Sequence, residues 1–378
     1  MRAVIAVISD LSTDMRVQKH ASVLSSMGFS VTLIGRYTGC SLPVSIPSAR
    51  VLMIRVPFRK GPMMYFSFNV VLLFRLLLLK KSDLYVANDL DTLIPCHLTS
   101  RLFVKPLVYD AHEYFTGQYS LTERKFKHSL WKMAERMLLP KLRSMITVSD
   151  SIAELYRQEY GCDPVVIRNL SVPADNIVPY QRSDLAAGIN ELLVVFQDGS
   201  GDNPGRGSAE LLEAMTLIDN VKLVVIGTGK RIEEAKQQVL KKQLDHKVIF
   251  LPRMKREELM RYIKCCDTGL SIDTDTCINQ RFSLPNKLFD TIAAGVPVIV
   301  SPLPEVSALV RKYECGLVLD EMTPRAIAGA LSLLRDDRQL LSGLSDKARA
   351  AAKELNWEKE QLAEQEFFRS VIEESSIK

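Results

Sequence analysis

The stretch Ser283-Leu-Pro-Asn-Lys-Leu-Phe-Asp-Thr-Ile-Ala-Ala-Gly-Val-Pro-Val-Ile-Val-Ser301 decides how this chain of 378 residues folds. It predicts a loop, a short helix, a glycine stop and a buried strand. Pro285 suits the first helical turn, where its missing amide hydrogen would be unpaired anyway. Gly295 suits the helix end, because glycine readily adopts a left-handed backbone conformation. Apolar residues that recur at helical spacing predict a face packed on a core. They are Leu288, Phe289, Ile292 and Ala293.

The amino end of this helix is a candidate phosphate site. The segment Asp267-Thr-Gly-Leu-Ser-Ile272 predicts a strand upstream, so the helix begins beyond the carboxyl end of a strand. Free backbone amides and the positive end of the helix dipole favour an anion there. Lys287 adds a full charge beside Asn286 in the first turn, and Asp290, one turn later on the expected polar side, is placed to hold ribose hydroxyls. The stretch therefore predicts a site for a nucleotide diphosphate.

The same stretch resembles the retaining glycosyltransferases of GT-B fold, specifically family 4. Leu284 to Phe289 and Gly295 to Ile299 match the family pattern, with Asp290 in place of the usual glutamate. The family pattern places a second glutamate eight positions earlier, near the transferred sugar, where this chain has Phe282. The resemblance implies an α/β protein of two doubly wound, Rossmann-like domains that face each other across a cleft. It also implies a nucleotide-sugar donor, UDP-sugar or GDP-sugar, with no cofactor and no metal.

Composition supports an ordinary globular protein of two domains. Charged residues make up 25% and apolar residues 47% of the chain, which is typical of soluble proteins. The net charge of +5 is mild and argues against a nucleic-acid binder. Seven cysteines without a CxxC pair favour reduced thiols, and a strand pattern at 3–9 stands where a signal peptide would lie. We therefore expect a cytoplasmic protein.

Short β-branched runs alternate with helical patterns through both halves, which predicts parallel sheets with crossover helices. The strands expected in the first half are 4–9, 31–34, 51–56, 84–87, 107–110, 145–148 and 165–167. Those expected in the second half are 192–196, 222–226, 248–251, 269–272, 298–300 and 316–319. We predict an acceptor-binding domain at 1–172 and a nucleotide-sugar-binding domain at 173–355, with a hinge within 170–189.

The last segment, 356–378, reads as a helix. Its expected apolar face consists of Leu362, Phe367, Phe368 and Ile372. The resemblance implies that this helix crosses back onto the N-terminal domain.

Residues 62–81 are apolar except for a few positions such as Asn69 and Arg75, and two lysines close the segment. With an internal charge, the segment falls short of a membrane-spanning helix. Two interpretations stay open. It is a helix in the membrane interface, with the basic residues of 59–81 meeting anionic lipid, or it is a buried helix of the N-terminal domain.

A glycine-rich loop at 197–207 follows a predicted strand and precedes a predicted helix. Its glycines permit close backbone approach to a ligand, and Arg206, beside Gly207, can clamp a diphosphate with two hydrogen bonds. The spacing differs from the dinucleotide fingerprint, and no acidic residue follows at the required distance. The resemblance favours a diphosphate site, and a flexible surface loop is the alternative.

Two further strand ends are candidates for the nucleotide base or ribose. By the resemblance, the turn with Gly227 and Gly229 lies beside the base or ribose, as does the backbone at Pro252 and Arg253. The alternatives are an ordinary strand-to-helix turn and a solvated surface charge at Arg253.

The segment Tyr109-Asp-Ala-His-Glu113 ends a predicted strand, at the edge where open α/β sheets bind ligands. The resemblance implies that His112 faces the transferred sugar, and we place Glu113 on the same side. A structural hydrogen-bonding histidine is the alternative. His20, His97, His128 and His246 show no metal-ligand spacing.

Three more acidic residues and an arginine are candidates for the acceptor or sugar side. Asp89 and Asp91 form an Asp-x-Asp pair, which can hold a metal in glycosyltransferases of another fold. We interpret them as lining the acceptor side, with helix capping as the alternative. Asp14 and Arg16 follow the first strand. Arg16 is a candidate phosphate or acceptor contact, and Asp14, with Ser12 and Thr13, also suits plain capping.

Together these residues predict a retaining glycosyltransferase that acts on a glycan or lipid-linked acceptor in surface polysaccharide or glycolipid assembly. His112 and Asp290 are the expected catalytic residues, and Arg206 with Lys287 would stabilise the leaving diphosphate. If 59–81 binds lipid, the enzyme sits on the inner face of the membrane.

Two other functions fit the same fold. One is a nucleotide-sugar 2-epimerase, which needs additional acid/base carboxylates. The other is a non-catalytic nucleotide-sugar binder, an alternative that stays open because Phe282 replaces the usual glutamate.

Overall fold

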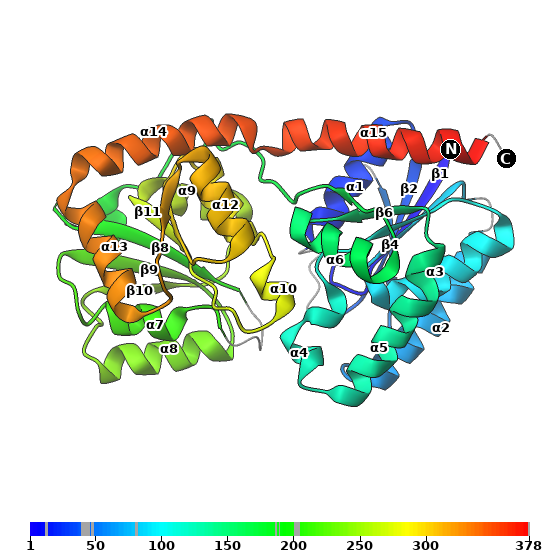
Figure 1. The fold of residues 1–378 in the computed structure, drawn as a ribbon, viewed down its shortest axis with the longest axis horizontal. Helices are drawn as coiled ribbons and strands as arrows, with labels where there is room; N and C mark the ends of the chain where they lie inside the picture. Colours follow the sequence, from blue (N-terminus) through cyan, green and yellow to red (C-terminus); the bar gives the residue numbers. More distant parts are fainter. Residues whose placement is uncertain are drawn as a thin grey trace. The chain divides into compact units, whose positions relative to one another are not determined.

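The computed structural model describes residues 1–11, 14–38, 46, 49–79, 82–185, 187–188, 190–199 and 205–376. Ser12 and Thr13, Lys80 and Lys81, and 200–204 of the glycine-rich loop lie outside the described residues. The chain divides into two units (Figure 1). Unit 1 comprises 1–117, 121–169 and 360–378, and unit 2 comprises 118–120 and 170–359.

Unit 1 contains a parallel sheet in the order β3-β2-β1-β4-β5-β6-β7. Its strands are β1 Arg2–Ala6, β2 Ser30–Arg36, β3 Ala49–Ile54, β4 Leu84–Asn88, β5 Leu107–Asp110, β6 Ser144–Thr147 and β7 Val165–Val166. Ala3 of β1 pairs with Val31 on one side and Leu84 on the other. The chain order reverses there, so a ligand is expected beyond the carboxyl ends of β1 and β4.

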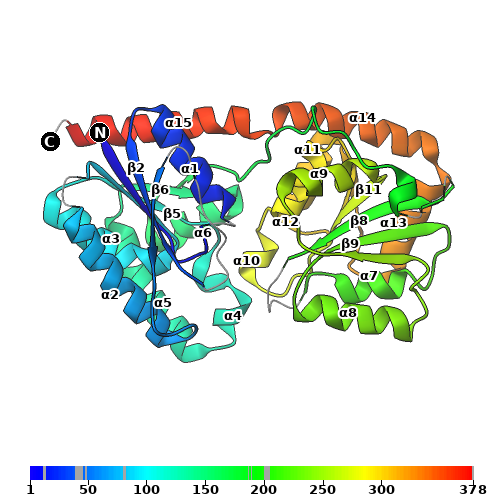
Figure 2. The ribbon, with the colours of Figure 1, turned by 180° about the vertical axis from the view of Figure 1, so that it is seen from behind.

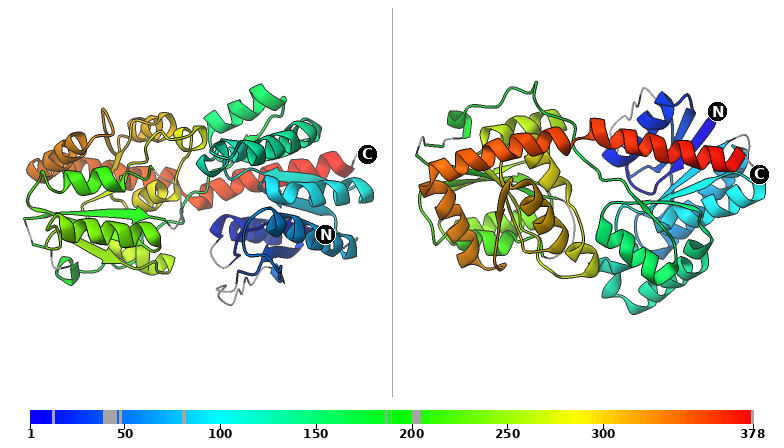
Figure 3. Two further views of the ribbon diagram at one scale, coloured as in Figure 1. Left: turned by 90° about the horizontal axis from the view of Figure 1, so that it is seen from below. Right: turned by 45° about the horizontal axis from the view of Figure 1, so that its top comes forward.

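The helices in the first 169 residues connect these strands, and the last helix joins them. They are α1 Met15–Ser26, α2 Pro62–Leu78, α3 Leu90–Phe103, α4 Tyr119–Thr122, α5 Lys125–Leu138 and α6 Asp150–Tyr160, followed at the end of the chain by α15 Trp357–Ser376. Figure 3 shows α15 running past α1. His20 of α1 bonds Glu364 of α15, and Phe368 packs edge-on against the His20 ring. The last helix therefore packs onto unit 1.

Unit 2 contains a second parallel sheet in the order β10-β9-β8-β11-β12-β13 (Figure 2). Its strands are β8 Leu192–Asp198, β9 Val221–Gly227, β10 Val248–Leu251, β11 Thr268–Ser271, β12 Val298–Val300 and β13 Gly316–Val318. Its helices are α7 Ser208–Ala214, α8 Lys230–Lys241, α9 Arg256–Cys265, α10 Ile278–Arg281, α11 Asn286–Ala293, α12 Pro304–Tyr313, α13 Pro324–Asp336 and α14 Arg338–Glu354.

All thirteen expected strands are present, and the predicted parallel α/β architecture is confirmed. Boundaries differ by up to three residues. The first strand ends at Ala6 and not at residue 9, although Val7 N–H still donates to Ile34 O at 2.9 Å. The units change at 169/170 and 359/360, close to the expected boundaries after 172 and 355.

The decisive stretch forms α11 and β12, with two corrections. Pro285 precedes the first helical residue and does not lie in the first turn. The expected polar side of α11 is wrong, because every residue from Lys287 to Ala293 is buried, Asp290 included. Gly295 has a φ of 70°, and a Cβ there would lie 2.7 Å from Arg349 Cγ. A side chain at this position would therefore be strained and crowded.

Helix α2 has two apolar faces. Met64, Phe68, Leu72 and Leu76 are buried, whereas Met63, Phe66, Val70, Phe74 and Leu78 are exposed. The core interpretation of 62–81 describes the first face only. Within the described residues, no helix has both the length and the apolar character needed to cross a bilayer.

Candidate functional site

Two cationic side chains converge on one buried carboxylate at the carboxyl end of the unit 2 sheet. Lys287, in the first turn of α11, places Nζ 3.0 Å from Asp273 Oδ1. Arg206 Nη1 lies 3.5 Å from the same oxygen, and its side chain is 35% exposed. Asp273 follows β11 closely in sequence. The structure thus brings Arg206 and Lys287 together, as a phosphate site requires.

The environment of Lys287 favours an additional anion. Burial lowers the pKa of its ammonium group, Asp273 opposes this shift, and the Arg206 charge adds to it. Lys287 Nζ also lies 5.3 Å from the centre of the Phe196 ring. A phosphate beside this ammonium would stabilise its charged form, because a nearby opposite charge favours ionisation.

A third cation, Arg231, belongs to the same cluster and was not among the sequence candidates. Its Nη2 lies 3.5 Å from Asp198 Oδ2 and donates to Ser208 Oγ at 3.2 Å. Asp198 ends β8 and is buried, and neither of its carboxylate oxygens accepts a hydrogen bond from a described residue. Burial raises the pKa of Asp198, while Arg231, Lys287 and Arg206 oppose the rise. Three cations therefore surround two buried carboxylates.

The glycines of the site allow close backbone packing. Gly207 has a φ of 78°, and a Cβ there would lie 2.1 Å from Ile272 O. A Cβ on Gly227 would lie 2.2 Å from Asp198 O. Gly229, with a φ of 108°, caps α8 just before Arg231. These positions require glycine for the fold itself, and contacts of Gly207, Gly227 and Gly229 to a nucleotide stay predictions.

Asp290 lies one turn beyond Lys287 and has two partners. Its Oδ1 accepts from Ser171 Oγ at 2.6 Å and pairs with Arg256 Nη1 at 2.5 Å. The carboxylate is buried, whereas Arg256 is 30% exposed. Asp290 therefore links α11 to α9 and to Ser171. A ribose bound here would share the Asp290 carboxylate with Arg256.

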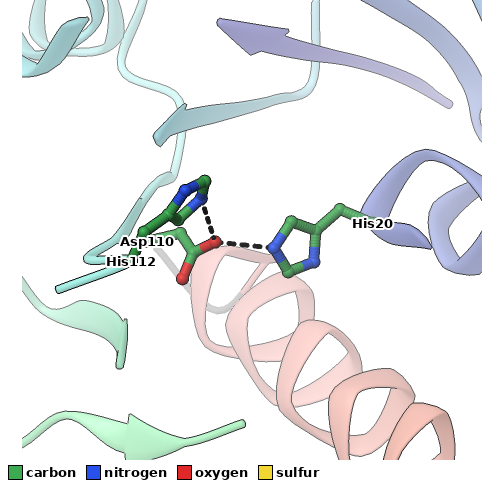
Figure 4. A group of neighbouring side chains, drawn as sticks. All are labelled: His20, Asp110 and His112. Atoms are coloured by element: carbon green, nitrogen blue, oxygen red, sulfur yellow. Dashed lines mark hydrogen bonds and ion pairs between the residues drawn. The ribbon is translucent and has the colours of Figure 1, made fainter. Parts of the chain in front are cut away.

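Unit 1 has its own buried cluster at the carboxyl end of β5. Arg16 donates through Nε and Nη2 to both oxygens of Asp110, at 2.7 and 2.6 Å. His20 Nε2 lies 2.6 Å and His112 Nε2 3.1 Å from Asp110 Oδ2. Figure 4 shows the two imidazole rings approaching Asp110 from different sides. One carboxylate thus holds two histidines and an arginine.

His112 is fixed on three sides. Its Nε2 also lies 3.1 Å from Asn88 Oδ1, its Nδ1 lies 3.5 Å from Asp89 Oδ2, and its backbone N–H donates to Asp89 Oδ1 at 3.1 Å. Burial lowers the pKa of His112, but Asp89 and Asp110 outweigh burial and raise it to about 10. The imidazole is therefore protonated at neutral pH.

Family models match both halves of the chain. The model of glycosyltransferase family 4 matches residues 15–170, and the model of the glycosyl transferases group 1 matches residues 203–353. The chain belongs to glycosyltransferase family 4.

Solved glycosyltransferase structures share its fold over nearly the whole chain. Sucrose-phosphate synthase from Thermosynechococcus elongatus matches with a TM-score of 0.81 at 17% identity, over 98% of this chain and 99% of the other. HepE from Anabaena, in complex with UDP and glucose, gives 0.75 at 16% identity over 98% and 100%. WaaG, a glycosyltransferase involved in lipopolysaccharide biosynthesis, gives 0.69 at 15% identity over 93% and 95%. The expected GT-B fold is confirmed.

In this family 4 glycosyltransferase the candidates for the acceptor side are unequally placed. Arg16 is buried, and its third nitrogen, Nη1, donates to Ile167 O at 2.9 Å, so its guanidinium supports Asp110 from within the fold. Asp14 caps α1 by accepting from Val17 N–H at 3.2 Å, which is the capping alternative. Glu113 is half-buried, and its backbone oxygen accepts from Tyr156 Oη at 3.2 Å.

Asp89 contacts His112 and differs from the capping alternative. Asp89 precedes α3 but makes no side-chain cap, and its φ of 58° is unusual for a residue other than glycine. Asp91 is buried, and burial together with the Asp89 charge raises its pKa well above the ordinary value. A strained residue and a carboxyl group whose pKa is raised by burial and a neighbouring charge are features that cluster at functional sites.

The group of His20, Asp110 and His112 has ligand atoms within 4.8 Å of one another, and sequence spacing gave no sign of it. The chemistry of this group does not suit a cation. Both oxygens of Asp110 already accept hydrogen bonds from Arg16. Burial lowers the pKa of His20, but Glu364 and Asp110 outweigh this effect and raise the pKa to about 9. A metal ligand needs a deprotonated ring nitrogen.

The remaining nucleotide candidates lie near the end of β10. Pro252 and Arg253 are both exposed, as is Asn286 at the start of α11. A hollow of about 1080 Å³ in unit 2 lies elsewhere. Residues before β11 and β12, such as Asp267 and Pro297, and residues of α14 line it. It is thus at the amino ends of the strands, where α/β sheets do not bind ligands.

Proposed function

We propose that this family 4 enzyme transfers a sugar, with retention, from UDP-sugar or GDP-sugar to a glycan or lipid-linked acceptor without a metal ion. The observation that carries the proposal is the convergence of Lys287, Arg206 and Arg231 at the carboxyl ends of β8 and β11, beside the amino end of α11. An entering diphosphate would take over cations that Asp273 and Asp198 now hold.

The proposed chemistry needs charge stabilisation of the leaving diphosphate. Preorganised cations and amide groups in a dry site supply most of such stabilisation in enzymes. Lys287 is buried and Arg206 lies beside it against the same carboxylate, so both charges are already in place when negative charge develops. Unit 2 would bind the donor, unit 1 the acceptor, and protonated His112 would contact the transferred sugar.

The comparisons support the donor class. Solved structures of HepE hold UDP, UDP with glucose, or UDP-glucose. Because this chain shares their fold, it has a parallel sheet whose strands end at a comparable edge. Asp290, with Arg256, is the proposed ribose side, and Pro252 and Arg253 the proposed base side. An enzyme of surface polysaccharide or glycolipid assembly is the role we infer for the chain.

The test is nucleoside diphosphate release from a panel of activated sugars, with and without glycolipid acceptors. Transfer of sugar to an acceptor supports the proposal, and the anomeric configuration of the product decides retention. Free epimerised sugar without acceptor would identify an epimerase. Donor binding by calorimetry without turnover on any acceptor would identify a non-catalytic binder.

We further propose that unit 1 docks on the anionic face of a membrane, through a surface wider than residues 59–81. Helices α2, α3 and α5 pack side by side, and the Tyr65 ring of α2 lies 5.7 Å from the Trp131 ring of α5. Each helix exposes an apolar stripe. On α2 the stripe contains Phe66, Phe74 and Leu78, on and just after α3 Ile94, Leu98, Leu102 and Val104, and on α5 Phe126, Leu130, Met133 and Met137.

The charges around these stripes favour lipid over a protein partner. In the described parts of 57–104 and 119–143, the exposed acidic residue is Glu123. The exposed basic residues are Arg59, Lys60, Arg75, Arg101, Arg124, Lys125, Arg136, Lys141 and Arg143. Apolar residues ringed by basic ones bind the headgroup region of anionic bilayers. Such a surface would bring the enzyme to a lipid-linked acceptor.

A further inference from the structure

The last helix places one carboxylate inside unit 1. Glu364 of α15 is fully buried, and its Oε1 lies 2.5 Å from His20 Nδ1. One turn later, Phe368 packs edge-on against the same ring at 6.4 Å between ring centres. These contacts join residues 344 positions apart in the chain. The end of the chain therefore reaches the cluster that holds His112.

His20 lies between two carboxylates. Its Nε2 is 2.6 Å from Asp110 Oδ2, and its Nδ1 faces Glu364. Ionised carboxylates only accept hydrogen bonds, so both ring nitrogens of His20 must carry protons. A protonated histidine here is paired on both sides with a carboxylate, and all three side chains are buried.

Asp110 in turn sets the proton on His112. Asp110 Oδ2 and Asn88 Oδ1 are both acceptors that face His112 Nε2 at 3.1 Å. The Nε2 atom therefore carries a proton and donates it to these acceptors. Nδ1, on the Asp89 side, is the ring nitrogen that can form a hydrogen bond to a substrate. Arg16 and His20 hold Asp110 in place for this hydrogen bond.

We propose that Glu364 and His20 are positioning residues for His112. Glu364 holds His20 as an imidazolium, and His20 with Arg16 fixes Asp110 so that it accepts the Nε2 proton of His112 and directs Nδ1 to the reacting side. This inference rests on the proposed function for the role of His112. The hydrogen-bonded order itself, Glu364–His20–Asp110–His112, stands on the geometry of unit 1.

The charged groups around His20 come from four elements. Arg16 is on its own helix, Asp110 and His112 are at the end of β5, Asp89 follows β4, and α15 contributes Glu360 as well as Glu364. Of these, Glu364 is the carboxylate that contacts Nδ1 directly. Removing its charge while keeping its size therefore isolates its effect on the His20 proton.

The first test is the pH profile of Glu364→Gln in the full-length enzyme. We expect unchanged donor affinity by calorimetry, an unchanged KM for the donor and a kcat at pH 8 that is roughly 10- to 100-fold lower, the size of effect that misplacement of a catalytic group produces. The alkaline limb of kcat should move to lower pH, and activity should recover as the pH is lowered to about 6. The matched control is Glu366→Gln, an exposed glutamate on the same helix.

A loss of kcat that is equal at every pH would indicate a merely structural role and overturn the proposal, as would a wild-type profile in Glu364→Gln. The second test needs no turnover. The chain has five histidines, so imidazole ¹⁵N resonances can be assigned with His20→Gln. We expect both His20 nitrogens to stay protonated through pH 8 in the wild type. A neutral His20 at pH 7 would overturn the proposal, whether or not the variant folds and whether or not the protein is a transferase.

Discussion

Lys287 Nζ lies 3.0 Å from Asp273 Oδ1, and both side chains are buried. A lysine held in this way beside Arg206 suits an anion, because the ammonium group is desolvated and shares the Asp273 carboxylate with a second cation. This ion pair connects α11 to the residues after β11. It places the positive charge of the stretch 283–301 at the carboxyl end of the sheet.

The substitution Lys287→Met should weaken nucleotide binding. Loss of a charge-assisted contact to the diphosphate is worth about 2 kcal/mol, or roughly 30-fold in the dissociation constant for UDP or GDP. Calorimetric titration with each nucleotide measures it. Lys230→Met is the matched control, because the Lys230 side chain is 85% exposed at the start of α8. Equal affinities for both variants would remove Lys287 from the phosphate site.

The substitution Arg231→Gln tests the cation that sequence analysis missed. We expect roughly tenfold weaker nucleotide binding and a smaller salt dependence, because one positive charge near the diphosphate is lost. The measurement is the dissociation constant at two salt concentrations. Lys236→Gln, also on α8 and paired with Glu233 at the surface, should bind like the wild type. A wild-type salt dependence in Arg231→Gln would place Arg231 outside the site.

Two glycine substitutions should have opposite effects on stability. Gly207→Ala puts a Cβ 2.1 Å from Ile272 O at a φ of 78°, so we expect a loss of about 2 kcal/mol or more in the free energy of unfolding. Gly343→Ala lies inside α14 with no atom within 4 Å of the added Cβ, and it should gain up to about 1 kcal/mol. Denaturant unfolding of both variants measures the difference. A harmless Gly207→Ala would show that the backbone there adapts easily.

Lipid binding should depend on the exposed stripes of unit 1. The double substitution Phe66→Ser and Phe126→Ser removes one exposed aromatic ring from α2 and one from α5, and we expect sedimentation with phosphatidylserine vesicles to fall several-fold. Leu240→Ser, an equally exposed apolar residue on α8 of unit 2, is the control. Equal sedimentation of all three proteins, or equal binding to neutral vesicles, would contradict the proposed membrane surface.

Stability of unit 1 should fall as the pH rises above neutrality. The pKa of His20 is raised to about 9 and that of His112 to about 10, against an ordinary value of 6.5. The stabilisation is therefore complete below about pH 6.5 and is lost as the pH rises through 9 to 10. Thermal unfolding between pH 6 and 10 should show this decline. His20→Gln should flatten it, and His246→Gln, exposed in unit 2, should not.

Local sequence patterns predicted the structure correctly where the pattern and the environment of its residues agree. Central strands such as β1, β4 and β8 are rich in apolar residues, because parallel strands are buried on both faces, and all thirteen strands were predicted. Lys287 became a candidate because a helix start, a glycine stop and a charge lie within one short stretch. Arg231 follows Gly229 at a strand's carboxyl end, and the same reasoning could have included it.

The spacing of apolar residues did not predict the buried face of α15, because one buried side chain there is charged. In α15 the expected apolar Leu362 is 60% exposed, whereas Glu364 is fully buried. A charged residue is assigned to the solvent side by any local rule, and only its distant partner, His20, makes burial favourable. Two interpretations of the apolar segment 62–81 stayed open for a related reason, because a helix that is apolar on all sides gives no indication of which face packs on the core.

The amino-acid sequence by itself determined the two parallel α/β sheets, the family and the short helix that carries Lys287, because each depends on contiguous residues with regular spacing. The tertiary structure alone decided the order Glu364–His20–Asp110–His112 and the meeting of Asp198 with Arg231. Buried charges are stable only beside partners, and those partners come from strands and helices that are far apart in the chain.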